Sequence, residues 1–242
     1  MASLRKKLLH SDLGGLLESK KEIESNCKGG NEHMEYQTSL LRDVVAYSIV
    51  HWFSMMECSV FGGFVAAHVS GKVWNDIDIM TPFGFLNGDC NKIIGRIVKH
   101  VRFVFGLSAL SIKVEPVQPK NYAKHFTLTF VVNELKFQIS IDMVEPRFMS
   151  PFVPVTLGRC LYLSDRCITK RRFQLFDILL SSWECEDIIG LLRDGKDVGL
   201  CMQLNKNQST QRAYSEYFWS RIKKIQSTGY DVCDFLGEKP VS

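Results

Sequence analysis

The stretch SVFGGFVAAHVSGKVWNDIDIM, residues 59–80, holds the most informative local pattern in the chain. It predicts a short strand over 58–61, a turn at Gly62 and Gly63, and one or two helical turns over 64–69. A glycine pair lets the backbone turn sharply and lets an anion approach its amides. The helix that follows offers unpaired N–H groups and the positive end of its dipole. The pattern therefore predicts a phosphate site at this turn.

The end of the same stretch carries two aspartates, Asp76 and Asp78, on a predicted strand over 76–80. Side chains two residues apart on a strand point to the same face, so Ile77 and Ile79 point the other way, into the core. Two carboxylates on one face repel each other unless a cation lies between them. A hard divalent cation suits such oxygen ligands, and magnesium with a triphosphate is the usual pairing.

A third carboxylate, Asp142, lies in KFQISIDMVEP, residues 136–146, near the end of another predicted strand. If that strand neighbours the one with Asp76 and Asp78, the three carboxylates can hold two metal ions roughly 3.5–4 Å apart. Asp142 is then the general base or a metal ligand beside the attacking oxygen. Each motif alone is weak, since most Gly-Gly pairs and strand aspartates are structural. Their combination in this order favours a site.

The remaining pattern predicts an α/β (α+β) fold, in which helices flank a mixed β-sheet and the C-terminal part is α-helical. We expect residues 1–35 to form a peripheral segment, 36–158 the domain that carries the candidate catalytic residues, and 159–242 a helical region. A turn at Asn133–Glu134 makes the last two strands of the catalytic domain a hairpin. The further elements expected are helices over 38–56, 92–105, 173–182, 185–193 and 209–226, and strands over 110–114, 125–132 and 136–144.

Composition excludes several classes of protein. A formal net charge of +4 over 242 residues does not by itself indicate a nucleic-acid binder. The eight cysteines form no C-x-x-C pair, which argues against a zinc ribbon or a redox motif and favours reduced thiols. No run approaches the ~18–20 apolar residues that span a bilayer, and no signal peptide is evident. We expect a cytoplasmic protein with no membrane partner.

The order strand, Gly-Gly, Asp-h-Asp and a later h-Asp-h strand, where h is apolar, resembles the DNA polymerase beta-like nucleotidyltransferase superfamily. Its motif falls on Gly62, Gly63, Asp76, Asp78 and Asp142. The resemblance covers roughly residues 40–145. It implies a mixed sheet flanked by helices, two Mg²⁺ ions (with Mn²⁺ as a substitute), and transfer of a nucleoside monophosphate from a nucleoside triphosphate to a hydroxyl.

Within the superfamily, GGFVAAHVSG looks most like the tRNA nucleotidyltransferase and bacterial poly(A) polymerase branch. That branch has an Arg-Asp pair where this chain has Ala67 and His68, which argues against CCA addition itself. The segments 159–180 and 221–232 are similar to regions that follow the catalytic domain in nucleotidyltransferases of large DNA viruses. The resemblance leaves the acceptor open among polynucleotide ends, small molecules and protein side chains. An RNA or DNA end is the one we favour.

Other residues have a functional and a structural interpretation. Lys72, in the turn after the short helix, is predicted to steer the triphosphate. His68 is expected on the helix surface, with a phosphate contact as the alternative. The basic residues Arg159 and Lys170–Arg172 are expected to be solvated, with a phosphate or acceptor contact as the alternative. An aromatic stripe is expected to pack its helix rather than bind a base. It consists of Tyr214, Tyr217, Phe218 and Trp219.

Three hypotheses follow. The first is an active nucleotidyltransferase that releases pyrophosphate. The second is a nucleotide-binding or assembly protein that keeps the fold without catalysis. The third is an unrelated α/β domain whose three aspartates never meet, which the distances between their carboxyl groups would decide.

Overall fold

The structure is a computed structural model that describes residues 31–105, 110–115, 118–120, 123–132, 135–145, 155–163, 174–175, 184–200 and 208–235. Within these ranges the helices are α3 (Asn31–Met55), α4 (Gly62–Ser70), α5 (Cys90–Phe105), α7 (Cys185–Arg193) and α8 (Gln208–Ser227), with 3-10 turns η1 (Phe85–Asn87) and η3 (Leu157–Cys160). The strands are β1 (Ser59–Phe61), β2 (Asp76–Met80), β3 (Leu110–Val114), β4 (Gln118–Lys120), β5 (Ala123–Val132), β6 (Leu135–Val144), β7 (Leu161–Leu163), β8 (Gln174–Leu175), β9 (Lys196–Leu200) and β10 (Asp231–Phe235).

One mixed sheet organises most of these strands in the order β3-β5-β6-β2-β1-β7-β8, with β4 paired to β5. The pair β2 and β6 is parallel. The neighbouring pairs β1–β2 and β5–β6 are antiparallel. The chain therefore has the expected α+β fold.

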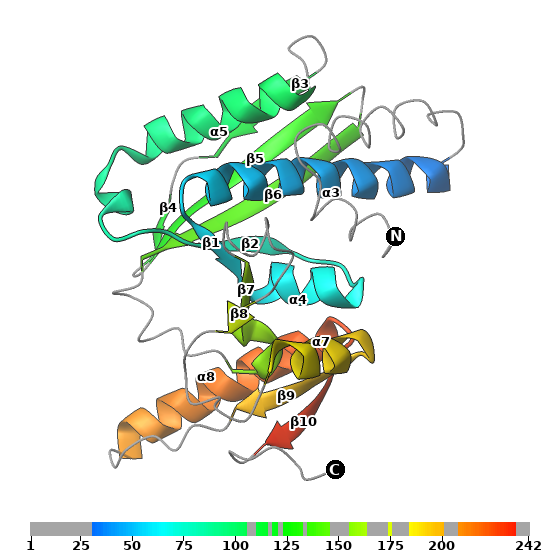
Figure 1. Ribbon diagram of the computed structural model, residues 1–242, viewed down its shortest axis with the longest axis vertical. Coiled ribbons are helices and arrows are strands. Elements are labelled where there is room, and N and C mark those ends of the chain that lie inside the picture. The colour runs from blue at the N-terminus through cyan, green and yellow to red at the C-terminus, as the bar shows by residue number, and fades with distance from the viewer. Residues whose placement is uncertain are drawn as a thin grey trace.

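Helices α3 and α5 cover one face of this sheet (Figure 1). The strand residues that point toward them are apolar and fully buried, as Ile77, Ile79, Ile139 and Ile141 show with 0% exposure. Burial of one such side chain contributes roughly 1.5–3 kcal/mol. The alternate residues of the same strands, with Asp78 among them, point to the opposite face. The period-two pattern read from the sequence thus separates an apolar face from a polar one.

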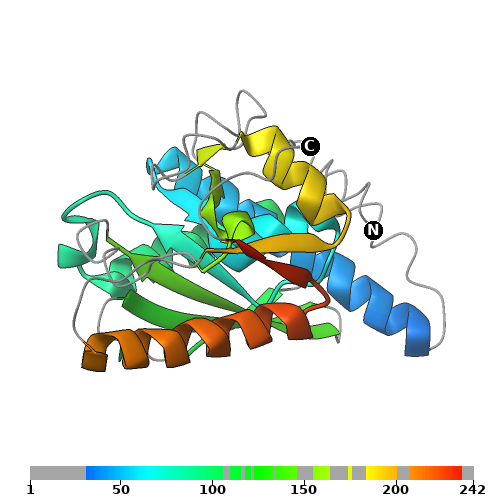
Figure 2. The same cartoon turned by 90° about the horizontal axis from the view of Figure 1, so that it is seen from below.

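The C-terminal part adds α7, α8 and a parallel pair of strands, β9 and β10. Figures 1 and 2 place α8 beyond the sheet face opposite to α3 and α5. Among the α8 side chains that the structure describes, residues 216–227, those of Phe218, Ile222 and Ile225 are buried hydrophobics at helical spacing. No helix among the described residues has the length and the apolar character to cross a bilayer.

Several predicted elements match the observed bounds, namely the strands over 76–80 and 110–114 and the helix over 185–193. The hairpin between β5 and β6 also forms, with Val132 opposite Leu135. The first helix begins earlier than predicted, at Asn31, so residues 31–35 of the expected peripheral segment are helical. The rest of that segment, 1–30, lies outside the described residues.

The C-terminal part was predicted to be helical, but it also contains strands. The strand β7 pairs with β1, so the main sheet continues past residue 158. The helix expected over 173–182 is wrong at Gln174–Leu175, which form β8, and its other residues, 173 and 176–182, lie outside the described ranges. Short strands of two to five residues give little periodic signal, and their partners here are distant in sequence.

Candidate functional site

The turn between β1 and α4 is built around Gly62, whose φ of 72° lies in the left-handed region that favours glycine. An added Cβ at Gly62 would lie 2.4 Å from Oδ2 of Asp78. At Gly63, by contrast, an added Cβ would meet nothing within 4 Å. The first glycine thus lets the backbone pass against the Asp78 carboxylate, and the second borders open space. Helix α4 begins here without a side-chain cap, so its first N–H groups are available to an anion.

The three predicted acids lie on one face of the sheet. Asp76 and Asp78 alternate with buried isoleucines on β2, and the parallel register sets Asp78 opposite Asp142 of β6. Residues opposite each other on neighbouring strands share a face, and the strands are about 4.8 Å apart. The structure therefore brings Asp142 beside Asp78, on the side of the sheet away from α3 and α5.

The electrostatics of Asp78 reflect this crowding. Burial, followed by the negative charges of Asp76 and Asp142, raises the pKa of Asp78 from its ordinary 3.8 to about 7. Two cations act in the opposite direction, Arg221 of α8 and Arg159 of η3. Both arginines come from the C-terminal part of the chain. The acids therefore lie between the main sheet and C-terminal elements that carry positive charge.

One residue of this face was not predicted from the sequence. His125 of β5 lies opposite Asp142 in the antiparallel register, and its Nδ1 lies 2.6 Å from Oδ1 of Asp142. The two side chains are 23% and 16% exposed. The signal was present in the sequence, because the predicted turn at Asn133–Glu134 fixes which residues of the hairpin face each other.

The carboxylates do not form a closed cage. Among the described residues, no three Asp, Glu, His or Cys side chains stand close enough to hold a metal ion together. Magnesium does not require such a cage, since it keeps several waters and is bound by one or two carboxylates plus substrate phosphates. The carboxylate donors and the open space at Gly63 therefore fit magnesium held together with a triphosphate.

Lys72 is not brought to the glycine turn. It follows the opposite end of α4, and nine helical residues span roughly 13 Å. Its ammonium donates a hydrogen bond to the carbonyl of Gly229 and lies 3.7 Å from the ring centre of Tyr230. Burial lowers its pKa, while Asp197 acts in the opposite direction. Lys72 thus joins α4 to the turn between α8 and β10.

Of the other residues named in the sequence analysis, some are buried and some are exposed. His68 is buried rather than on the helix surface, and its Nδ1 shares a hydrogen bond with the hydroxyl of Tyr47. In the aromatic stripe Phe218 is buried, as expected, whereas Tyr217 and Trp219 are 39% and 50% exposed. The side chain of Tyr214 and the run Lys170–Arg172 lie outside the described residues.

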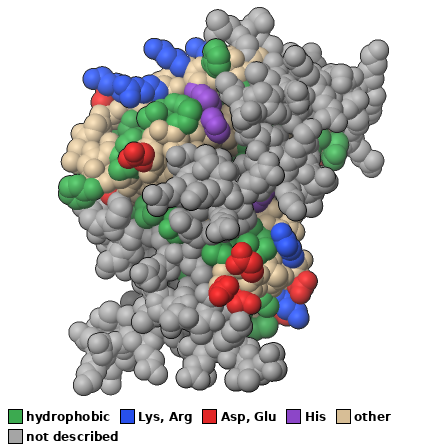
Figure 3. Space-filling model, in the orientation of Figure 1, with side chains coloured by type: hydrophobic (Ala, Val, Ile, Leu, Met, Phe, Trp, Pro, Cys, Tyr) green, Lys and Arg blue, Asp and Glu red, His purple; other side chains and the backbone are tan. Residues whose placement is uncertain are grey.

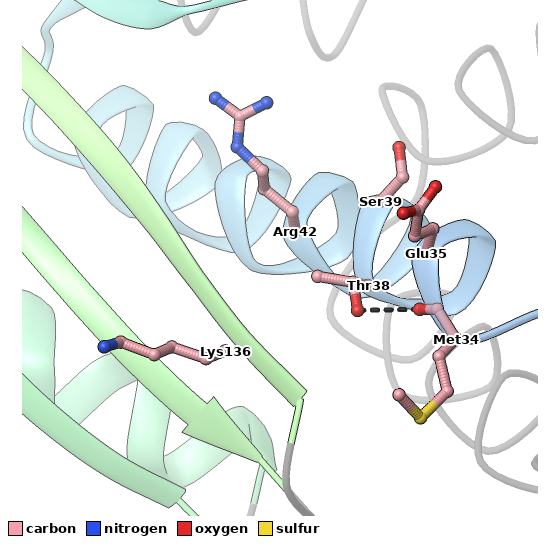
Figure 4. A pocket seen from close by; sticks show the side chains of 6 residues that line it. All are labelled: Met34, Glu35, Thr38, Ser39, Arg42 and Lys136. Atoms are coloured by element: carbon pink, nitrogen blue, oxygen red, sulfur yellow. Dashed lines mark hydrogen bonds between the residues drawn. The ribbon is translucent and has the colours of Figure 1, made fainter. Parts of the chain in front are cut away.

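A separate hollow of about 640 Å³ lies beside the N-terminal half of α3 (Figure 4). Its lining residues are Met34, Glu35, Thr38, Ser39, Arg42 and Lys136. Lys136 precedes Asp142 by six residues of β6, or roughly 20 Å along a strand, so this hollow is not the acidic site. The guanidinium of Arg42 donates to the carbonyls of Trp74 and Asn75. That contact fixes the chain immediately before β2.

These observations define an α+β protein with an acidic sheet face beside a glycine turn. No model of a known protein family matches the chain, and no curated protein matches it in sequence. Two solved structures align with part of it. JHP933 from Helicobacter pylori does so at 8% identity and a TM-score of 0.34, over 45% of this chain and 44% of that one. A candidate nucleotidyltransferase from H. pylori does so at 8% identity and a TM-score of 0.33, over 44% of each chain. The chain therefore spans less than half the length of either protein.

Proposed function

We propose that the chain is a magnesium-dependent nucleotidyltransferase that moves a nucleoside monophosphate from a nucleoside triphosphate to a hydroxyl. The observation that carries this proposal is the shared position of three groups. The β2–β6 register sets Asp142 beside Asp78, and the Gly62 turn passes against the same Asp78 carboxylate. The carboxylates proposed to bind the metal ions and the glycine turn proposed to bind phosphate are thus neighbours.

Asp76, Asp78 and Asp142 are the residues that would hold the ions. The pKa of Asp78 is raised first by burial and then by the charges of Asp76 and Asp142, and a cation at this position would offset both effects, which supports the assignment. Two Mg²⁺ ions, or Mn²⁺ in their place, would supply charge neutralisation for the triphosphate and an activated acceptor hydroxyl. The glycine at position 62 lets the Asp78 carboxylate lie against the turn, and the open space for a phosphate oxygen lies at Gly63.

The chain's own groups account for the rest of the reaction. The N–H groups at Gly62 and Gly63 receive the phosphates, and Arg159 and Arg221 add positive charge from the other side. The acceptor oxygen forms a bond to the α-phosphorus, and the bond from that phosphorus to the bridging oxygen breaks. Pyrophosphate leaves with the electron pair. The hydroxyl proton passes to the carboxylate of Asp142, which the imidazole of His125 orients.

A polynucleotide end is the acceptor that we propose. The acidic face continues along β6 through the alternate residues Ser140, Gln138 and Lys136, the last two exposed. On β5 the hydroxyl of Thr127 hydrogen-bonds to Ser140 at 3.0 Å. Hydroxyl, amide and ammonium groups are the usual partners of phosphate and sugar oxygens. This polar row starts beside Asp142, where an acceptor hydroxyl has to be.

The second candidate is a catalytically inactive nucleotide-binding or assembly protein with the same fold. Two observations favour it. Asp142 is already engaged by His125, and no group of three ligating side chains is preassembled within the described residues. Such a protein would bind a triphosphate at the glycine turn without turnover.

Incubation with each α-labelled triphosphate separates the two functions. The reactions contain Mg²⁺ or Mn²⁺ and a pool of RNA, DNA and protein acceptors. The double variant Asp76→Asn/Asp78→Asn is expected to lose at least about 10³-fold in label transfer, because neutral amides do not hold the ions. Asp231→Asn, which changes an exposed aspartate of β10, is the control and should retain activity. Transfer that survives in the double variant would contradict the mechanism, and triphosphate binding without transfer by the unchanged chain would favour the second candidate.

A further inference from the structure

A pair of histidines lies between α3 and α5, on the side of the sheet away from the acids. His51 belongs to α3 and His100 to α5, and both are partly exposed. Their ring centres are 6.4 Å apart and the ring planes differ by 17°. Figure 3 shows histidine side chains, in purple, at the surface of the face that carries these two helices.

Each ring has a buried nitrogen with no hydrogen-bond partner, Nδ1 of His51 and Nε2 of His100. Buried polar atoms are nearly always paired, so two such nitrogens on neighbouring rings require an explanation. A neutral imidazole nitrogen without a proton is a lone-pair donor, and its partner is either a proton donor or a metal ion.

The surroundings of His100 favour the metal ion. A ring N–H of His100 donates to the backbone carbonyl of Ser48, one turn before His51 on α3. Because Nε2 is the unpaired nitrogen, the proton lies on Nδ1 and the Nε2 lone pair is left for a ligand. Metal-bound histidines usually donate their other N–H to a carbonyl in this manner. Burial also lowers the pKa of His100, which keeps the ring in the neutral form that binds metals.

The spacing of the rings sets how an ion could bind. A transition metal lies 2.0–2.1 Å from each imidazole nitrogen, so the centres of two rings that share an ion are about 5 Å apart at a tetrahedral angle and at most about 6.4 Å apart when the nitrogens lie on opposite sides of the ion. The 6.4 Å separation of the nearly parallel rings equals that upper limit, so any other arrangement requires the rings to approach and turn toward the ion. Imidazole ligands suit zinc, cobalt, nickel and copper, whereas magnesium prefers oxygen.

We propose that His51 and His100 form a two-imidazole site for a late first-row divalent metal ion, which clamps α3 to α5. Waters complete the coordination, since no third Asp, Glu, His or Cys of the described residues joins the pair. The site is separate from the acidic face and does not depend on nucleotidyl transfer.

Titration of the full chain with Co²⁺ tests this site, because the visible spectrum of Co²⁺ distinguishes imidazole from thiolate ligands. With excess Mg²⁺ present to occupy the acidic face, we expect saturable binding of one equivalent of Co²⁺ with an imidazole-type spectrum, accompanied by a higher melting temperature. Replacement of either ring, His51→Gln or His100→Gln, should weaken binding roughly tenfold or more. His33→Gln, at the start of the same helix, is the matched control and should bind normally.

A second measurement uses the unchanged protein, in case a variant folds poorly. One equivalent of Co²⁺ should broaden the imidazole NMR signals of two of the six histidines. Broadening of all six, a thiolate-type spectrum from the cysteines, or equal affinity in His51→Gln, His100→Gln and the unchanged chain would overturn the proposal.

Discussion

The two faces of the main sheet are made by the same strands but have opposite energetics. On β2, Ile77 and Ile79 are fully buried beneath the helices, whereas Asp76 and Asp78 lie on the other face. The apolar face stabilises the fold by its burial. The acidic face gathers like charges, and burial and repulsion raise the pKa of Asp78 to about 7. Neighbouring residues on one strand thus contribute separately to the stability of the fold and to the proposed site.

Substitution of two adjacent residues of β2, one on each face of the sheet, tests most directly whether the two faces have opposite effects on stability. Ile77→Ala should lower the free energy of unfolding by about 2–5 kcal/mol, because the side chain is fully buried. Asp78→Asn should raise that free energy at pH 8 without metal, because it removes a charge from a crowded site. Denaturant unfolding of both variants measures the two effects. Equal destabilisation by the two substitutions would show that Asp78 is a structural residue.

The pH dependence of stability tests the acidic face alone. The folded pKa of Asp78 is raised, so the folded state binds its proton more tightly than the unfolded state does. The resulting stabilisation is fully present below pH 4 and is lost as pH rises through about 7. The rise of the Asp78 pKa from 3.8 to about 7 corresponds to at most about 4 kcal/mol in the free energy of unfolding.

Unfolding of the metal-free chain between pH 4 and pH 8 measures this loss. In Asp78→Asn that contribution to the pH profile should be absent. Addition of Mg²⁺ at pH 8 should stabilise the unchanged chain more than the variant. A profile that is the same in both proteins would show that Asp78 keeps an ordinary pKa.

Alanine substitutions at the two glycines of the turn form a matched pair, and we expect their effect on stability to be smaller than that of the changes in β2. Gly62→Ala places a Cβ 2.4 Å from Oδ2 of Asp78 on a backbone with positive φ, so the turn or the carboxylate must move. We expect a loss of about 1–3 kcal/mol in stability and weaker triphosphate binding. Gly63→Ala meets nothing within 4 Å and should fold normally. Thermal melting and triphosphate titration of both variants test this, and equal behaviour would argue against a specific role for Gly62.

The sequence predicts the apolar and the acidic face of β2 because alternation is a local signal. Asp76 and Asp78 must share a face once 76–80 is a strand, and the Asn133–Glu134 turn makes β5 and β6 a hairpin. The sequence does not show that β2 and β6 are parallel neighbours, since this pairing joins residues more than sixty positions apart. It also does not show the cations from Arg159 and Arg221, which depend on how the C-terminal part packs. Lys72 illustrates the same limit, because the sequence does not show its contacts with Gly229 and Tyr230, which also depend on how the C-terminal part packs.

The smallest effect that we predict concerns His125, which orients Asp142 without holding an ion itself. His125→Gln removes the imidazole that lies 2.6 Å from the Asp142 carboxylate. Loss of such an orienting partner typically costs 10–100-fold in metal affinity or activity, and we expect about tenfold because Asp142 keeps its place on β6. The readout is the Mg²⁺ concentration for half-maximal label transfer, measured separately from the maximal rate. Thr129→Val, on the same strand and face, removes a hydroxyl that contacts Gln138 instead and should leave the Mg²⁺ dependence unchanged. If His125→Gln and Thr129→Val gave the same Mg²⁺ dependence, His125 would be only a structural neighbour of the acids.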